Sequence, residues 1–194
     1  ATLREPYRVE GKKTILFEIW EQLGGMPDWI LVPTGGGTGV AGIWKALDEL
    51  RSLGWYEGPW PRIGIVQAEG CAPLVKAWKE GKDVGEPWPA PKTAATGLRV
   101  PATLGDRIVL RAIRATRGAA VTVSEEAIAV AAASLEALEG ISSSLEGAAT
   151  LAGLRRLYDD GTITSEDRVV LVNTGSRKRA GALPKIPTVH SARE

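Results

Sequence analysis

The residues best suited to chemistry form one short run of small side chains, Gly35, Gly36, Gly37, Thr38 and Gly39. An apolar, strand-like run precedes them and a segment with helical periodicity follows. The N-terminus of a helix presents unpaired N–H groups and a partial positive charge. Glycines let an anion approach such groups closely because no Cβ intervenes. The pattern therefore predicts an anion site, to which the hydroxyl of Thr38 adds a donor.

A nucleoside triphosphate is excluded as the anion. Its loop requires a lysine and a Ser or Thr directly after the last glycine, whereas apolar residues follow here and the next lysine is Lys45.

A dinucleotide is the second alternative. Gly37, Gly39 and Gly42 match G-x-G-x-x-G, and Glu69, at the end of the next predicted strand, is placed to bind ribose hydroxyls. The fingerprint lies several residues beyond the strand end, however, and Glu69 lies farther on than the usual ~20 residues.

A single phosphate monoester is the third alternative, and pyridoxal phosphate carries one. Such a group can be bound entirely by main-chain N–H groups, and the run 35–39 supplies enough small residues in a row. A glycine-rich turn without a ligand remains a fourth interpretation.

The elements around this run alternate between strand and helix patterns. Strands are predicted at 29–33, 63–68, 119–123 and 169–173, and helical spacing is found in the segments 12–25, 39–54, 72–81, 105–118, 124–140 and 143–161. Valine- and isoleucine-rich strands separated by helices are typical of a parallel sheet that is covered on both faces. We therefore expect an α/β fold, a three-layer αβα sandwich with a mostly parallel sheet. Ligands bind at the carboxyl ends of such strands.

Composition limits the other possibilities. The chain has 194 residues, 44% of them hydrophobic and 24% charged, with a net charge of +1. This balance favours neither nucleic acid nor a membrane as a partner. A single cysteine and a single histidine, His190, argue against metal sites and Ser-His-Asp chemistry, and the cysteine usage is typical of the cytoplasm. We expect one unit over residues 1–176 and a poorly ordered tail over 177–194.

Four further segments follow the glycine run in a fixed order: VQAEGCAPLVKAW, TGLRVP, EGISSSLEGAATLAGLRRL and RVVLVNTGS. With the preceding REPYRVEGKKTILFEIWEQLG, they resemble the threonine synthase group of pyridoxal-phosphate enzymes, of fold type II in the tryptophan-synthase-β-like superfamily. The resemblance runs from about Arg4 to Ser176. It implies the larger part of the fold-type-II large domain, with pyridoxal 5'-phosphate as cofactor.

The resemblance also implies roles for individual residues. The run 35–39 matches the loop that binds the cofactor phosphate, and Thr174 matches the hydroxyl residue that meets the pyridine nitrogen. Glu146 matches an acidic position that lines the site. From local sequence alone, Thr174 can equally be a turn residue. Likewise, Ser143 and Glu146 have the spacing of a capping box, in which the glutamate bonds back to the helix start.

One part of the family pattern is not found. The Schiff-base lysine of the family and its substrate-binding asparagine loop lie in the N-terminal half, and neither motif occurs here. We therefore expect the C-terminal half of the family, with no catalytic residue in this chain and the missing N-terminal half as a partner.

The family activity would convert O-phosphohomoserine, an amino-acid substrate, to threonine and phosphate, in a homodimer. A threonine dehydratase-like enzyme, a non-catalytic remnant that binds phosphate or a partner chain, and a dinucleotide-binding dehydrogenase domain are the alternatives.

Overall fold

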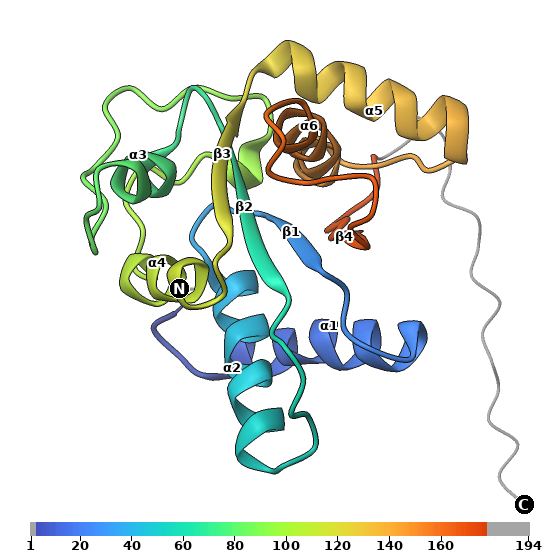
Figure 1. Cartoon of the computed structure of the whole chain (residues 1–194). Helices are drawn as coiled ribbons and strands as arrows, with labels where there is room; N and C mark the ends of the chain where they lie inside the picture. Colours follow the sequence, from blue (N-terminus) through green and yellow to red (C-terminus); the bar gives the residue numbers. More distant parts are fainter. Residues whose placement is uncertain (1–2, 178–194) are drawn as a thin grey trace, which may run out of the picture.

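The computed structural model describes residues 3–177, so the predicted tail lies outside the described residues except for Arg177. Four strands form one sheet: β1 (Trp29–Pro33), β2 (Arg62–Ala68), β3 (Ala119–Val123) and β4 (Val169–Leu171). Their order is β3-β2-β1-β4, and every neighbouring pair is parallel (Figure 1). The predicted strands are confirmed, although β4 ends two residues earlier than expected.

Helices connect and cover these strands. They are α1 (Tyr7–Leu23), α2 (Thr38–Ser52), α3 (Pro73–Lys79), α4 (Asp106–Ala115), α5 (Glu125–Glu139) and α6 (Leu145–Asp159), with a short 3₁₀ helix, η1 (Thr96–Leu98). Ser124 caps α5, since its hydroxyl accepts a hydrogen bond from the Ala127 N–H at 3.1 Å. Within residues 3–177, no helix has both the length and the apolar character needed to cross a membrane.

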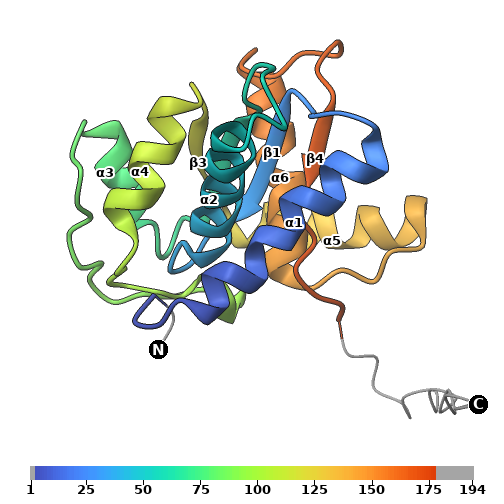
Figure 2. The same ribbon diagram turned by 90° about the horizontal axis from the view of Figure 1, so that it is seen from below.

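The strands are apolar on both faces because each face carries its own core. In β1, Ile30 and Val32 pack with the helices α1 to α4, whereas Trp29 and Leu31 pack with α5 and α6. This alternation follows from the period of two residues in a strand. Seen along two directions, the sheet lies between the two helical layers (Figures 1 and 2). The expected three-layer αβα sandwich is thus confirmed.

The strand order creates a reversal in the middle of the sheet. From β1 the chain proceeds outward through β2 to β3, and it then returns by α5 and α6 to place β4 on the other side of β1. The loops that follow β1 and β4 therefore leave the same edge of the sheet in neighbouring positions, and residue 172 continues the pairing through its N–H to the Leu31 carbonyl at 3.0 Å. Such a switch point is where open α/β sheets bind their ligands.

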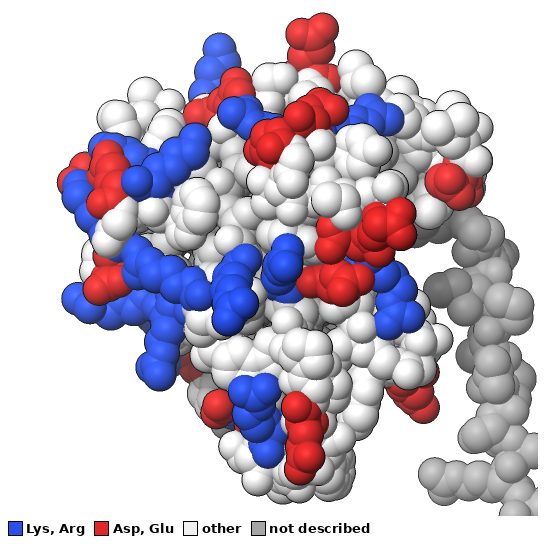
Figure 3. All heavy atoms as spheres, viewed as in Figure 1, with Lys and Arg blue, Asp and Glu red and all other residues white. Residues whose placement is uncertain are grey.

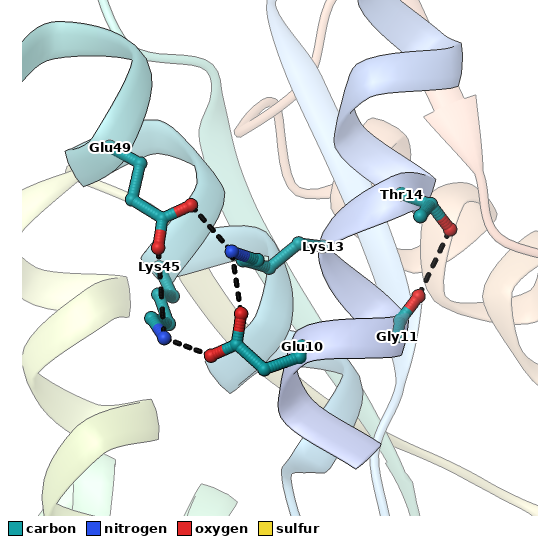
Figure 4. Close-up of polar contacts among 6 residues, drawn as sticks. All are labelled: Glu10, Gly11, Lys13, Thr14, Lys45 and Glu49. Carbon is teal, nitrogen blue, oxygen red and sulfur yellow. Dashed lines mark hydrogen bonds and ion pairs between the residues drawn. The ribbon is translucent and has the colours of Figure 1, made fainter. Parts of the chain in front are cut away.

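On the face seen in Figure 3, charged side chains of both signs are scattered among uncharged ones, and basic side chains gather over α4. On another side, α1 is joined to α2 by a ring of four charges, Glu10, Lys13, Lys45 and Glu49 (Figure 4). Lys13 Nζ lies 2.6 Å from Glu10 and 2.7 Å from Glu49. The ring holds α1 against the helix that begins at the glycine run.

Candidate functional site

The glycine run lies at the switch point, between the end of β1 and the start of α2. Six consecutive backbone N–H groups, those of residues 35–40, donate to no acceptor among residues 3–177. The last three belong to the first turn of α2, where a helix has no partners of its own for them. Gly35, Gly37 and Thr38 are buried, so these donors do not all face bulk water. A row of unpaired donors at the positive end of a 15-residue helix is suited to an anion.

The glycines are required by the packing of the loop. Gly37 adopts a φ of 87°, and a Cβ on it would lie 2.4 Å from Val109 Cγ2. A Cβ on Gly35 would lie 2.2 Å from the carbonyl oxygen of Gly97, in η1. Gly36 differs from both, because a Cβ there would meet nothing closer than Val100, at 4.0 Å. The loop is thus fixed on both sides, with room for a side chain at Gly36.

A buried glutamine fixes the entry to the loop. Gln67, fully buried in β2, donates from Nε2 to the carbonyl oxygen of Thr34 at 3.0 Å. Its Oε1 accepts from the N–H groups of Leu74 and Val75, both at 3.0 Å, at the start of α3. One side chain therefore ties the residue before the glycine run to a neighbouring helix. The sequence analysis did not identify Gln67 as a residue of the site. A lone polar residue inside an otherwise apolar strand is, however, a sequence signal for a buried hydrogen-bonding role.

The side chain of Glu146 hydrogen-bonds to η1 and not to the start of its own helix, α6. Its Oε1 accepts from the N–H of Gly97 at 2.8 Å. The capping-box interpretation is wrong: Ser144 caps α6 through the Gly147 N–H at 3.2 Å, and the Ser143 N–H donates to the Ile141 carbonyl. Glu146 thus orients η1, the segment on which Gly35 packs.

Thr174 lies at the same sheet edge, in the segment that follows β4. The hydroxyl of Ser143 bonds to Asn173 Oδ1 at 3.0 Å, and the Ser144 N–H donates to the carbonyl of Gly175 at 2.8 Å. These contacts hold Asn173 by its side chain and Gly175 by its backbone, on either side of Thr174. Its own side chain is exposed and makes no hydrogen bond to another described residue.

Comparison with known proteins shows which family the chain belongs to. The family described as "Pyridoxal-phosphate dependent enzyme" matches residues 1–175. The chain belongs to this family. Its cofactor is pyridoxal phosphate, whose single phosphate monoester suits a row of main-chain donors.

Several curated relatives of this pyridoxal-phosphate family are named threonine synthases. Those of Methanosarcina acetivorans and Methanocaldococcus jannaschii are 40% and 36% identical over 88% of this chain. That of Mycobacterium tuberculosis is 33% identical over 95% of it. The chain spans less than half of these relatives, 42% of the two archaeal enzymes and 49% of the mycobacterial one.

Solved structures of similar fold include maize serine racemase, with a TM-score of 0.71 and 23% identity, covering 90% of this chain and 51% of that one. The threonine deaminase of T.th. has a TM-score of 0.69 and 23% identity, covering 92% and 56%. At this level of identity the likeness concerns the fold, which is that of pyridoxal-phosphate enzymes of fold type II.

The loop fits the phosphate of this family's cofactor. The donors of residues 35–40 are aligned at one helix start, and Gly36 leaves a space in which no side chain intervenes. Family membership also disfavours the dinucleotide interpretation. Glu69, which would bind ribose there, lies 3.8 Å from Arg156 of α6.

None of the lysines of the described segment belongs to the glycine run; they lie in α1, α2, α3 and the connection after α3: Lys12, Lys13, Lys45, Lys76, Lys79, Lys82 and Lys92. Lys13, Lys45, Lys76 and Lys82 are held in ion pairs. Lys178 and Lys185 lie outside the described residues, so the absence of a cofactor-binding lysine stays a prediction.

Cys71 is buried, and burial raises the pKa of its thiol. A thiol held in its neutral form does not act as a nucleophile. Residues 3–177 also contain no group of three His, Cys, Asp or Glu side chains arranged to hold a metal ion.

Proposed function

We propose that residues 1–176 form the cofactor-phosphate unit of a threonine synthase-type enzyme. The observation that carries this proposal is the row of unpaired N–H groups at the switch point, in a chain of the pyridoxal-phosphate family. Gly35, Gly36, Gly37, Thr38 and Gly39 bind the phosphate of pyridoxal 5'-phosphate through their main-chain N–H groups, and the Thr38 hydroxyl adds a donor. The bound cofactor supplies the electron sink.

Two further residues complete the cofactor site. We assign the hydroxyl of Thr174 to the pyridine nitrogen, supported by its exposed position at the carboxyl edge of the sheet. A neutral hydroxyl leaves that nitrogen largely unprotonated, which a carboxylate would not. Glu146 lines the site by holding the Gly97 N–H and, through η1, the face against which Gly35 packs.

The reaction is the conversion of O-phosphohomoserine and water to threonine and phosphate. Its support is that the curated relatives compared above are all named threonine synthases. The remaining half of the enzyme supplies the lysine and the contacts to the amino-acid substrate, and the assembled enzyme is a cytoplasmic homodimer. The sheet edge agrees with a further partner, because the residues of the edge strand β4 are apolar and all only partly buried.

A threonine dehydratase-like activity is the second candidate, and its support is weaker. Threonine deaminase appears among the structural neighbours, but at an identity that concerns the fold alone. The third candidate is a non-catalytic remnant of such an enzyme. It would still bind phosphate at the glycine run, but it would have no activity even when paired with an N-terminal half.

The phosphate loop is tested with a matched pair of variants at Gly36, where a Cβ would meet nothing closer than Val100, at 4.0 Å. Gly36→Asp and Gly36→Asn have the same shape and differ in charge, so their difference isolates repulsion of the phosphate. Titration calorimetry with pyridoxal phosphate measures the affinity, and pyridoxal without the phosphate is the ligand control. We expect Gly36→Asp to weaken binding at least about tenfold more than Gly36→Asn, the loss typical of one charge-assisted contact. Equal affinities would refute the loop assignment.

The activity is tested by co-expressing this chain with the N-terminal half of the Methanosarcina acetivorans relative. Release of inorganic phosphate from O-phosphohomoserine, with equimolar threonine, is expected from the pair and not from this chain alone. Borohydride reduction followed by peptide mapping then locates the lysine that is modified by the cofactor. A stoichiometric adduct on a lysine of this chain would contradict the assignment of halves, whereas a pair that binds cofactor without turnover would favour the remnant.

A further inference from the structure

An open hollow lies where α1 and α2 end, away from the glycine run. It has a volume of about 540 Å³, and it is lined by Phe17, Trp20, Glu21, Gly24, Leu50 and Trp55. Its walls are therefore aromatic and aliphatic, with a single carboxylate among the lining residues. Because α2 has 15 residues, the hollow lies about 22 Å along that helix from the glycine run, so an occupant of the hollow leaves the glycine run open.

Large apolar side chains are exposed in this hollow and beside it. Trp55 is 67% exposed, whereas every other tryptophan of the described chain is buried or half-buried. Leu53 is 61% exposed, and Leu23, in the last turn of α1, is 38% exposed. Exposed apolar groups that lie together are typical of an interaction surface, and tryptophan is a frequent anchor residue in such surfaces. The ends of α1 and α2 are therefore suited to an apolar partner.

The same surface favours a positive charge. Glu21 is exposed and forms no ion pair with another described residue. The last turn of α1, where the helix end is negative, contains no basic residue. Arg51, in the last turn of α2, is engaged outside the hollow, since its Cζ lies 4.3 Å from the centroid of the Trp60 ring and its guanidinium donates to the Gly58 carbonyl at 3.2 Å. The occupant that fits is thus an apolar segment that carries a positive charge.

The chain contains such a segment beyond its described residues. Residues 183–189 read LPKIPTV, in which two prolines three positions apart enclose a lysine. In the polyproline II conformation, which this composition favours, three residues make one turn, so positions 183, 186 and 189 share one apolar face. Segments of this P-x-x-P type bind grooves lined by aromatic side chains. Residues 178–194 contain four Lys or Arg and one Glu, so the segment complements the hollow in charge as well.

The position of Arg177 favours the segment of a second copy over that of the same chain. The Arg177 N–H donates to the Ser142 carbonyl at 2.9 Å, and its guanidinium lies 3.5 Å from Glu136 of α5. The helices α5 and α1 lie on opposite faces of the sheet (Figures 1 and 2). Leu183 is only six positions after Arg177, about 20 Å when fully extended. Within that length the segment would have to pass around the sheet to reach its own hollow, whereas the segment of a second copy is not limited in this way.

We propose that the hollow binds residues 183–189 of a second copy of this chain, independently of the proposed enzymatic function. Lys185 pairs with Glu21, and the apolar face of the segment packs on Trp20 and Trp55. Two copies that exchange this segment form a closed dimer with two-fold symmetry, because each copy supplies one hollow and one segment.

A mixture of differently labelled copies tests the contact directly. One copy carries a nitroxide attached through Ser191→Cys, just beyond the segment, while the buried Cys71 stays unmodified. The other copy is isotope-labelled and carries no nitroxide. We expect the indole N–H signals of Trp20 and Trp55 in the isotope-labelled copy to broaden, and that of Trp88, beside α3, to stay sharp. Broadening that occurs only when both labels are on one chain would place the segment in its own hollow and overturn the proposal.

Sedimentation equilibrium measures the dimer dissociation constant of matched variants. Trp55→Ala should weaken dimerisation at least about tenfold, as expected of an anchor residue, and Leu138→Ala, at an exposed residue of α5, should change it less than about twofold. Lys185→Gln should weaken it about two- to fivefold through loss of the exposed pair with Glu21. Lys178→Gln, which removes the same charge outside residues 183–189, is its control and should have a smaller effect.

A synthetic peptide of residues 182–190 should compete with the segment and dissociate the dimer. A chain that stays monomeric at all concentrations, or a dimer that Trp55→Ala leaves intact, would overturn the proposal. A dimer that is lost in Leu138→Ala would place the interface on α5 instead, with the same consequence.

Discussion

Replacing Gln67 by leucine tests how the glycine run is held in place. The side chain is fully buried and makes three hydrogen bonds, one to the Thr34 carbonyl and two from the N–H groups of Leu74 and Val75. Leucine has a similar volume but satisfies none of the three groups, all of which lie on buried residues. Each buried group without a partner costs about 1–3 kcal/mol.

The apolar surface of leucine offsets part of this cost, since burial contributes roughly 25 cal/mol per Å². We therefore expect a net loss of about 2–4 kcal/mol in the free energy of unfolding. In a domain of this size that lowers the melting temperature by about 4–16 °C. Because Thr34 directly precedes the glycine run, affinity for pyridoxal phosphate should fall as well.

Urea unfolding followed by circular dichroism measures the stability, and calorimetry measures the affinity. Gln22→Leu, the same substitution at an exposed position of α1, is the control and should stay within about 0.5 kcal/mol of the parent. If both leucine variants unfold at the same urea concentration, the three hydrogen bonds of Gln67 do not stabilise the fold as described.

Four other perturbations follow from the same structure. Gly37→Ala should destabilise the fold by about 2 kcal/mol or more, because residue 37 has a φ of 87° and its Cβ would lie 2.4 Å from Val109. Gly11→Ala, in open space within α1, is the control and should stabilise the fold by about 0.5–1 kcal/mol. Urea unfolding measures both. Glu146→Ala should expose the 96–98 turn to limited proteolysis, and Glu146→Gln, which keeps the acceptor for Gly97, should not; equal cleavage would contradict this role. Hydrogen bonds from Lys13 and Lys45 lower the pKa of Glu10. The ionised Glu10 therefore stabilises the fold above the unfolded pKa near 4.5, and this contribution is lost as the pH falls through the lower folded pKa. Glu10→Gln should flatten the acid side of a plot of unfolding free energy against pH. Native Cys71 should resist iodoacetamide until urea unfolds the chain, because burial raises its pKa, and rapid native alkylation would argue against that burial.

The strands and the glycine run could be predicted because their signals are local. A strand covered on both faces is apolar at nearly every position, so 29–33 and, apart from Gln67, 63–68 can be recognised from the sequence. The left-handed backbone at Gly37 likewise needs a glycine wherever the fold places it. Neither signal depends on residues far away along the chain.

The contacts that fix the site could not be predicted because they join distant segments. Glu146 and Gly97 are 49 residues apart, and nothing near either one indicates the other. The capping-box interpretation failed for a related reason. Three serines precede Leu145; Ser143, which has the spacing to Glu146, pairs with Ser176 after β4, and Ser144 caps the helix.

The unpaired donors and the buried glutamine answer the same physical requirement. Six N–H groups can bind an anion tightly only if they are held in position before it arrives, because ordering a glycine-rich loop on binding costs conformational entropy at every residue. In the proposed site the loop cannot use its own N–H groups for this purpose, since they stay free for the phosphate. It is therefore fixed from outside, by Gln67 on the carbonyl of Thr34 and by η1 and Val109 against its glycines. In the proposed site, Gln67 and Val109 therefore act on the position of the loop and not on the ligand.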